Sequence, residues 1–375
     1  MFAANGAALA SWVVRIPDVR AELGLRDTTL GLALAAASVG VVSALPLAGG
    51  IIPRVGSRRV VLVGVTVVGI TLATLAIAPG PLALAGLLLV FGAGLSTMDV
   101  GMNAHGVAVE GGYGRSILVG FHAAWSLGSL VAAGVGALAV AARVPLGVHF
   151  GIVAATVVVA TLLALPWLRV VDRVTADERT RRRRGPALAL PHGAIVPIAI
   201  VSLGAALGES AVTDWSGIFL RDAVEVAPGQ VGWGFVAFTA AMTVTRLLGD
   251  RVADRIGRAR TVALGAWVAT GGFVLAVAIP SVPTALIGFF AVGVGVAVTI
   301  PLSFAAAGGV TDSPGEGIAG VAAVSYAGFL VAPPVLGAIA DRASIRVSLL
   351  LVAVAMLILA GRPDAFPEPP VDTEP

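Results

Sequence analysis

Polar and ionisable side chains recur at helical spacing inside two apolar stretches of the sequence. The first set is Asp99, Asn103, Gly106 and Glu110, and the second is His122, Trp125, Ser126 and Ser129. Steps of three and four residues place each set on one face of a helix. An ionisable group at the centre of a membrane helix costs about 2.5–3.5 kcal/mol, so it marks a functional site by default. The two faces therefore predict a shared polar cavity.

Asp99 is the residue that we expect to carry a proton. It precedes Glu110, which we expect at the inner end of the same helix, by 11 positions. At about 1.5 Å per residue this places it roughly 16 Å deeper, near the middle of a bilayer. His122 and Asn103 are its candidate partners. The alternative is that Asp99 only forms a structural hydrogen bond with one of them.

Further polar residues extend the predicted pathway. Glu209 shares a helical face with Ser202, Thr213 and Ser216, although a charge at the outer helix end would give the same pattern. Asp214 falls off that face, and we expect it at the membrane interface. Arg246 and Asp250 are four residues apart, which predicts a local ion pair. Trp125 and Tyr326 hold near-equivalent places, where their rings could stack on a sugar or drug or simply pack between helices.

The composition excludes a soluble globular protein. The 375 residues are 58% hydrophobic and only 12% charged, with a mean hydropathy of +0.98, whereas soluble domains carry about a quarter charged residues. Lysine and cysteine are absent, which removes P-loop, Schiff-base and thiolate chemistry. No nucleophile–base pair or metal-ligand cluster appears, so we expect neither an enzyme nor a cofactor.

Charge-free runs of one-helix or two-helix length predict an all-α membrane protein with twelve spanning helices. The arginine-rich segment 169–191 would link a first six-helix half, 1–168, to a second, 192–361, followed by a Pro/Glu-rich tail, 362–375. An arginine run can also bind nucleic acid, but membrane-like flanks argue against it. The first apolar run has only 14 residues, so the first helix is either truncated or continues past Arg15.

The two halves repeat each other. GFHAAWSLGSLVAAGV from Gly120 aligns with GVAAVSYAGFLVAPPV from Gly320, and PRVGSRR from Pro53 aligns with DRIGRAR from Asp254. Six helices per half give both halves the same orientation, which is a parallel repeat. Most of the 24 arginines fall in loops on one side. The positive-inside rule then places both termini and the linker in the cytoplasm, in a cell membrane.

The DRIGRAR turn resembles the G-x-x-x-D-R-x-G-R-x-R loop of the major facilitator superfamily (MFS). Its matching residues are Asp254, Arg255, Gly257 and Arg258, and those of the first-half copy are Arg54, Gly56 and Arg58. The glycine permits a tight turn, and the aspartate can face a helix N-terminus. The resemblance implies an inward latch. The first-half copy departs from it, with Pro53 in place of the aspartate.

MDVGMNAHGVAVE with FHAAWSLGS resembles a bacterial branch related to the fucose permease. That resemblance implies proton-coupled symport of a sugar-like solute by carboxylates in helices one and four. Asp99 matches the second of these, whereas helix one offers only Asn5. We expect a monomeric secondary transporter that moves a small solute with protons across the bilayer by alternating access. Proton-driven efflux of amphiphiles and a non-transporting membrane sensor or scaffold are the alternatives.

Overall fold

Every regular element in the described part of the chain is helical. A computed structural model describes residues 1–113, 117–168, 191–310, 314–360 and 366. The predicted linker and tail therefore lie outside the described residues, apart from Pro191 and Phe366. Phe366 is 4% exposed and packs with Ile195 and Val262.

The first group of helices, which we call the first bundle, covers residues 1–168. It consists of α1 (Phe2–Val13), α2 (Ile16–Glu22), α3 (Asp27–Val55), α4 (Ser57–Leu75), α5 (Pro81–Tyr113), α6 (Leu118–Ala141), α7 (Leu146–Ala164) and the 3₁₀ turn η1 (Leu165–Trp167). Proline begins α5, as expected for a residue without a backbone N–H.

The second bundle covers residues 191–360. It consists of α9 (Ile195–Asp222), the 3₁₀ turn η2 (Pro228–Gln230), α10 (Trp233–Ile256), α11 (Arg258–Ala278), α12 (Val282–Val296), α13 (Thr299–Gly309), α14 (Pro314–Arg342) and α15 (Ile345–Ala360). A capping box between Ser281 and Thr284 begins α12.

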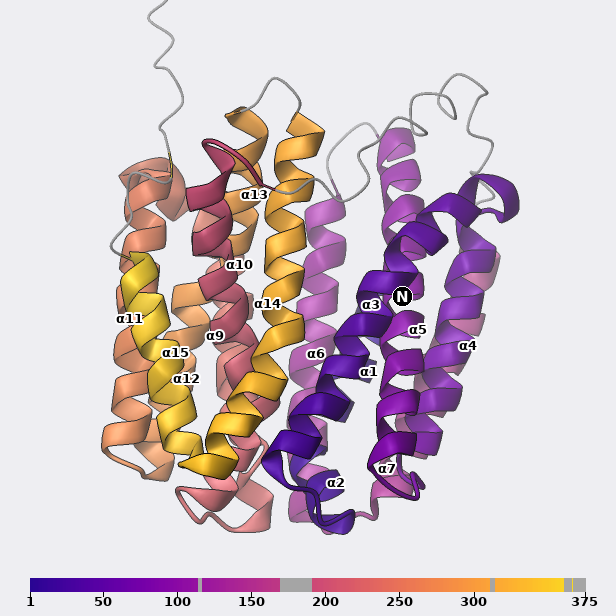
Figure 1. Cartoon of the computed structure of the whole chain (residues 1–375). Coiled ribbons are helices and arrows are strands. Elements are labelled where there is room, and N and C mark those ends of the chain that lie inside the picture. Colours follow the sequence, from indigo (N-terminus) through magenta and orange to yellow (C-terminus); the bar gives the residue numbers. More distant parts are fainter. Residues whose placement is uncertain (114–116, 169–190, 311–313, 361–365, 367–375) are drawn as a thin grey trace, which may run out of the picture.

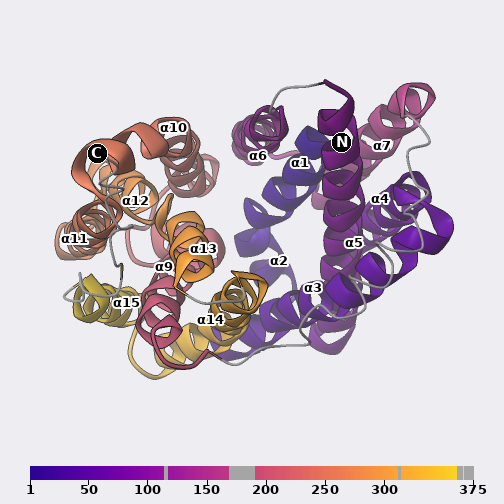
Figure 2. The same ribbon diagram turned by 90° about the horizontal axis from the view of Figure 1, so that it is seen from above.

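The helices lie side by side as two bundles (Figures 1 and 2). Seen from above, α1–α7 occupy one side and α9–α15 the other. The two bundles meet mainly where α3 packs on α14 and α6 packs on α10. We call the end that carries α2 and η2 the α2 end, and the opposite end, where α7 finishes and α9 begins, the linker end.

Ten stretches of the described residues are long and apolar enough to cross a membrane, and α15 is a shorter apolar helix. The first helix, α1, has only 12 residues. The structure thus supports a multi-pass all-α membrane protein. The count of twelve spans and the internal repeat remain predictions.

Helix α10 extends past the apolar part of its sequence. It continues through the exposed residues Arg251 and Arg255 to Ile256 and stops at Gly257. Between α1 and α3 the chain forms the short helix α2, with Pro17 in its first turn.

The turns after α3 and α10 share one backbone geometry. Gly56 has φ 85° and ψ 150°, and Gly257 has φ 86° and ψ 151°. This region is essentially restricted to glycine. The predicted tight turn at Gly257 is therefore confirmed, and its counterpart at Gly56 has the same shape.

Several glycines inside the helices allow close packing. A Cβ on Gly92 of α5 would lie 2.1 Å from the carbonyl oxygen of Ala37 in α3, and one on Gly40 would lie 2.0 Å from that of Leu89. Such contacts are shorter than any side chain permits. The two backbones can approach only because both helices carry glycine there.

Candidate functional site

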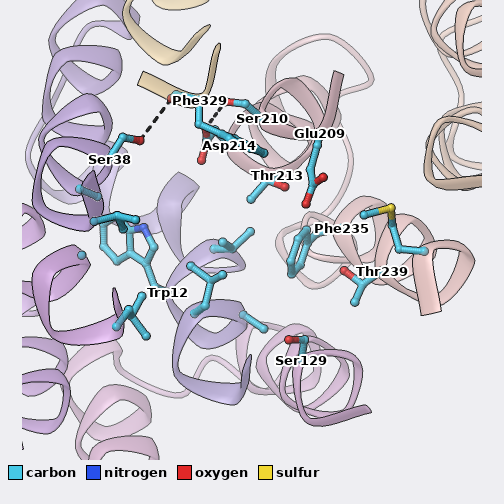
Figure 3. A pocket seen from close by; sticks show the side chains of 18 of the residues that line it. Trp12, Ser38, Ser129, Glu209, Ser210, Thr213, Asp214, Phe235, Thr239 and Phe329 are labelled. Carbon is cyan, nitrogen blue, oxygen red and sulfur yellow. Dashed lines mark hydrogen bonds between the residues drawn. The ribbon is translucent and has the colours of Figure 1, made fainter. Parts of the chain in front are cut away.

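A cavity of about 270 Å³ lies between the two bundles (Figure 3). Helices α1, α3, α5 and α6 form one wall, and α9, α10 and α14 form the other. Its hydroxyl and charged lining residues are Ser38, Ser126, Ser129, Glu209, Ser210, Thr213, Asp214, Thr239, Thr243, Arg246 and Tyr326. Its other aromatic residues are Trp12, Phe91, Trp125, Phe235, Phe238 and Phe329. The lining is mostly apolar, as is usual for small-molecule sites.

Glu209 and Arg246 form an ion pair in this cavity. The carboxylate of Glu209 in α9 lies 3.9 Å from the guanidinium of Arg246 in α10. Arg246 also donates from Nε to the carbonyl of Ala297, at 3.4 Å, where α12 ends. This pair joins two helices. The local pair with Asp250 stays a prediction, because the side chain of Asp250 lies outside the described residues.

Asp214 also lines the cavity, which corrects its predicted place at the membrane interface. The helix α9 runs to Asp222, so Asp214 lies two turns before its end. Ser210 donates a hydrogen bond to Asp214 Oδ2 at 2.8 Å, one turn earlier on the same helix. Figure 3 shows Asp214 on the wall beside Ser210 and Thr213.

Asn5 holds a cavity residue from behind rather than lining the cavity itself. Trp125 donates from Nε1 to Asn5 Oδ1 at 3.0 Å, and Asn5 donates from Nδ2 to the carbonyl of Leu95 at 3.1 Å. Asn5 is only 5% exposed. It therefore joins α1, α5 and α6 and fixes the Trp125 ring against the cavity.

Asp99 and Asn103 are joined to each other on α5. Asn103 donates from Nδ2 to Asp99 Oδ1 at 3.1 Å and to the Asp99 carbonyl at 3.0 Å. Neither residue is among those lining the cavity.

The predicted pathway residues thus divide into two groups. Trp125, Ser126, Glu209 and Tyr326 line the cavity, whereas Asp99, Asn103, His122 and Asn5 lie outside its lining. His122 meets the ring of Phe2 edge-on, with 5.2 Å between the ring centres.

Other polar residues of the predicted faces serve the fold. Glu110 accepts hydrogen bonds from the backbone N–H of Ile117 and Leu118, at 2.7 and 2.8 Å, and so caps α6. The buried His149 accepts a hydrogen bond at Nδ1 from Arg15 Nε, at 3.1 Å. This hydrogen bond joins the start of α2 to α7.

A second charged cluster joins the bundles at the α2 end, and sequence reasoning missed it. Arg20 pairs with Asp222 at 2.6 Å, and Arg221 donates to the carbonyl of Pro17 at 2.6 Å. Asp341 of α14 accepts the backbone N–H groups of Asp27 and Thr28 at 3.0 and 2.9 Å. No local pattern links positions about 200 to 300 residues apart.

The predicted gate residues lie at the linker end. Asp254 and Arg255 are exposed near the end of α10, and in the described part of the chain Asp254 has no hydrogen-bond or ion-pair partner. Arg54 is exposed as well and donates to the carbonyl of Gly50 in its own helix, at 3.2 Å. Arg58 is the second residue of α4, after Gly56 and Ser57. Within the described residues the structure therefore shows the turns but no engaged latch.

Comparisons with known proteins agree with this architecture. The sequence profile of the Major Facilitator Superfamily matches residues 1–223 and 189–373. An uncharacterized MFS-type transporter of Yersinia pestis is 34% identical over 358 residues, which cover 95% of this chain and 91% of that protein.

Two solved structures have the same fold. The nucleoside transporter NupG, as its D323A mutant, superposes with a TM-score of 0.81 at 13% identity over 97% of each chain. A bacterial homolog of the human lysosomal transporter Spinster, in an inward-facing and occupied conformation, superposes with a TM-score of 0.76 at 12% identity over 97% and 94% of the two chains. The family consists of transporters, not enzymes. The chain belongs to the Major Facilitator Superfamily.

Proposed function

We propose that the chain is a secondary active transporter that moves a small solute through the central cavity by alternating access, coupled to protons. One observation carries the proposal: a cavity with an internal ion pair is walled by both bundles, and the bundles are tied together at one end. A rocking motion of two such bundles about a fixed central site would expose the cavity to each side in turn.

The topology is part of this proposal. Helices α1 to α7 and α9 to α15 would supply six spans each, α12 and α13 together making one and α2 none. The arginine bias places the linker and tail in the cytoplasm. The α2 end then faces outward, and the tied bundles represent the state that is closed outward. A single chain holds both cavity walls, which is consistent with a monomer.

Glu209 is the proton carrier that the cavity supports best. At 3.9 Å from Arg246 it forms a loose ion pair, and protonation would release the guanidinium. The Glu209–Arg246 pair would form when Glu209 loses its proton and break when Glu209 gains one. This change of charge can shift the equilibrium between two packing arrangements of α9 and α10. Asp99 remains the second candidate, since it is an ionisable residue inside the apolar helix α5, where Asn103 donates a hydrogen bond to it.

The lining favours a solute with an apolar body. Aromatic side chains surround the space, among them Trp12, Phe235 and Phe329, and such rings contribute mainly by apolar contact and stacking. This supports efflux of amphiphilic compounds more than uptake of a sugar-like solute. A sensor or scaffold with this fold is the alternative from another class.

Proton flux in reconstituted vesicles tests the proposal. Candidate solutes are first selected by their ability to raise the unfolding temperature of the purified protein, since a ligand at 100 times its Kd stabilises by about 2.7 kcal/mol. Each hit is then added outside vesicles that contain a pH-sensitive dye. We expect solute-dependent acidification or alkalinisation with the wild type and none with protein-free vesicles. Stabilising solutes that drive no proton movement would favour the sensor.

A further inference from the structure

The charged groups of the cavity do not balance. The lining contains two carboxylates, Glu209 and Asp214, and one guanidinium, that of Arg246. Glu209 lies beside Arg246. Asp214 receives one hydrogen bond, from Ser210, and within the described residues no cationic side chain forms an ion pair with it. With all three groups ionised, the cavity carries one excess negative charge.

An ionised carboxylate at Asp214 has fewer hydrogen-bond donors around it than it can accept from. An ionised carboxylate offers about four acceptor sites, and a single hydroxyl fills one of them. A buried charge without a partner is costly in a membrane protein, so a complementary charge from a ligand would gain more here than at a solvated surface. Asp214 lies on the wall of the cavity, where a solute can reach it (Figure 3).

The rest of the wall suits the same kind of ligand. Trp12, Phe235 and Tyr326 line the same space, and the face of an aromatic ring attracts a cation within about 6 Å of its centre. The shared cavity supplies both the carboxylate that would pair with a charged head and the rings that would cover an apolar body.

We propose that the cavity binds an organic cation, an ammonium group carried on an apolar or aromatic body, with Asp214 as its counter-ion. The proposal rests on transport through this cavity and names the class of solute. An anionic solute would have to displace Glu209 from Arg246 and would also face Asp214. A neutral polyol would leave the Asp214 charge unpaired.

Radiolabelled benzyltrimethylammonium is the probe for a binding test. Full-length protein in lipid nanodiscs is titrated with the probe, and protein-free nanodiscs supply the blank. We expect saturable binding that unlabelled benzyltrimethylammonium displaces. The neutral isostere neopentylbenzene and the anion benzenesulfonate should displace it at least tenfold less well. Absence of saturable binding, or equal displacement by the neutral isostere, would overturn the proposal.

Two substitutions locate the charge. Asp214→Asn should weaken binding of the cation at least tenfold, whereas Asp214→Glu should keep most of it. Glu225→Gln is the matched control, because it removes one carboxylate from the exposed loop that follows α9. Unchanged affinity in Asp214→Asn would contradict the assignment.

A further measurement does not depend on the folding of Asp214→Asn. The chain contains no cysteine, so Thr213→Cys places a unique thiol on the cavity wall. Benzyltrimethylammonium should slow its reaction with a maleimide, and benzenesulfonate should not. Equal protection by both compounds would sink the cation proposal. If the cation does not bind but another solute drives proton flux in vesicles, only the cation proposal fails. If the cation binds but no solute drives proton flux, only the transporter proposal fails.

Discussion

The guanidinium of Arg20 lies 2.6 Å from the carboxylate of Asp222, and this contact joins α2 of the first bundle to the end of α9 in the second. Arg20 also lies 2.8 Å from Asp27. The side chains are 20% and 34% exposed for the Arg20–Asp222 pair, and Asp27 is 11% exposed. One cation therefore connects two carboxylates, each at the end of a long helix.

Replacing Arg20 should loosen the α2 end. An isolated surface pair contributes about 0.2–1 kcal/mol, and a partly buried cation shared by two carboxylates should lie at or above that range. We expect Arg20→Ala to raise, by several-fold, the rate at which an impermeant maleimide labels Thr213→Cys from the α2 side. Arg342→Ala is the control, because in the part of the chain that the structure describes Arg342 donates only to Ala338 of its own helix. Equal labelling rates in the two variants would show that Arg20 does not hold the bundles together at the α2 end.

Asp341 makes a second contact between the bundles, in which its carboxylate accepts hydrogen bonds from the backbone of α3. The N-cap of α3 is Arg26, whose side chain gives no capping bond, and the carboxylate of Asp341 takes over that role from the other bundle. Loss of a helix cap costs about 0.5–2 kcal/mol. We expect Asp341→Ala to lower the unfolding temperature and to increase labelling from the α2 side. Asp18→Ala removes a carboxylate that pairs within the first bundle, so it should leave the labelling rate unchanged.

Local sequence rules predicted what depends on neighbours along the chain. The helical faces, the close packing at glycines and the turn at Gly257 follow from periodicity, side-chain size and backbone freedom. Trp125, Ser126, Glu209 and Tyr326 were placed in the pathway on the same grounds, and all four line the cavity.

The features of the site that the sequence did not predict depend on contacts between residues far apart in the chain. The approach of α9 to α10 brings Glu209 to Arg246, and the four-residue rule, which pairs Arg246 with Asp250, could not find this partner. Asp214 was placed at the interface because nothing in the sequence marks how far α9 extends beyond it. The capping of α3 by Asp341 joins residues 314 positions apart, and no local pattern encodes such a contact.

The two turn glycines should be intolerant of a side chain. At φ 86° and ψ 151°, a residue other than glycine costs of order 1–3 kcal/mol. We expect Gly257→Ala and Gly56→Ala to lower the unfolding temperature of the purified protein. Gly271→Ala is the control, because Gly271 lies in α11 without a positive φ and with open space where the added methyl group would lie. A control that lost as much stability as the turn variants would point to helix packing instead.

The latch proposed for Asp254 predicts the opposite shift from Arg20. Asp254 is exposed here, so it would act in the state that closes the linker end, by facing a helix N-terminus. We expect Asp254→Asn to favour the state that is open at the linker end. Maleimide labelling of Thr213→Cys should then rise from the linker side and fall from the α2 side. Unchanged labelling from both sides would contradict the proposed role of Asp254 as a latch.

Two carboxylates compete for the role of proton carrier, and one assay separates them. With one proton exchanged for each monovalent organic cation, a gradient of one pH unit supplies about 1.4 kcal/mol, enough for at most a tenfold solute gradient. We expect Glu209→Gln to abolish this accumulation, because the cavity pair with Arg246 no longer titrates. Exchange of solute at equal pH should partly survive, since it needs no net proton movement.

Asp99→Asn provides the comparison in the same vesicles. Asp99 is hydrogen-bonded to Asn103 and lies outside the cavity lining, so this variant should still accumulate solute, at a reduced rate. Glu225→Gln, in an exposed loop, should behave as the wild type. The reverse result, with accumulation lost in Asp99→Asn and kept in Glu209→Gln, would assign proton coupling to α5. The Glu209–Arg246 pair would then serve only to hold α9 against α10.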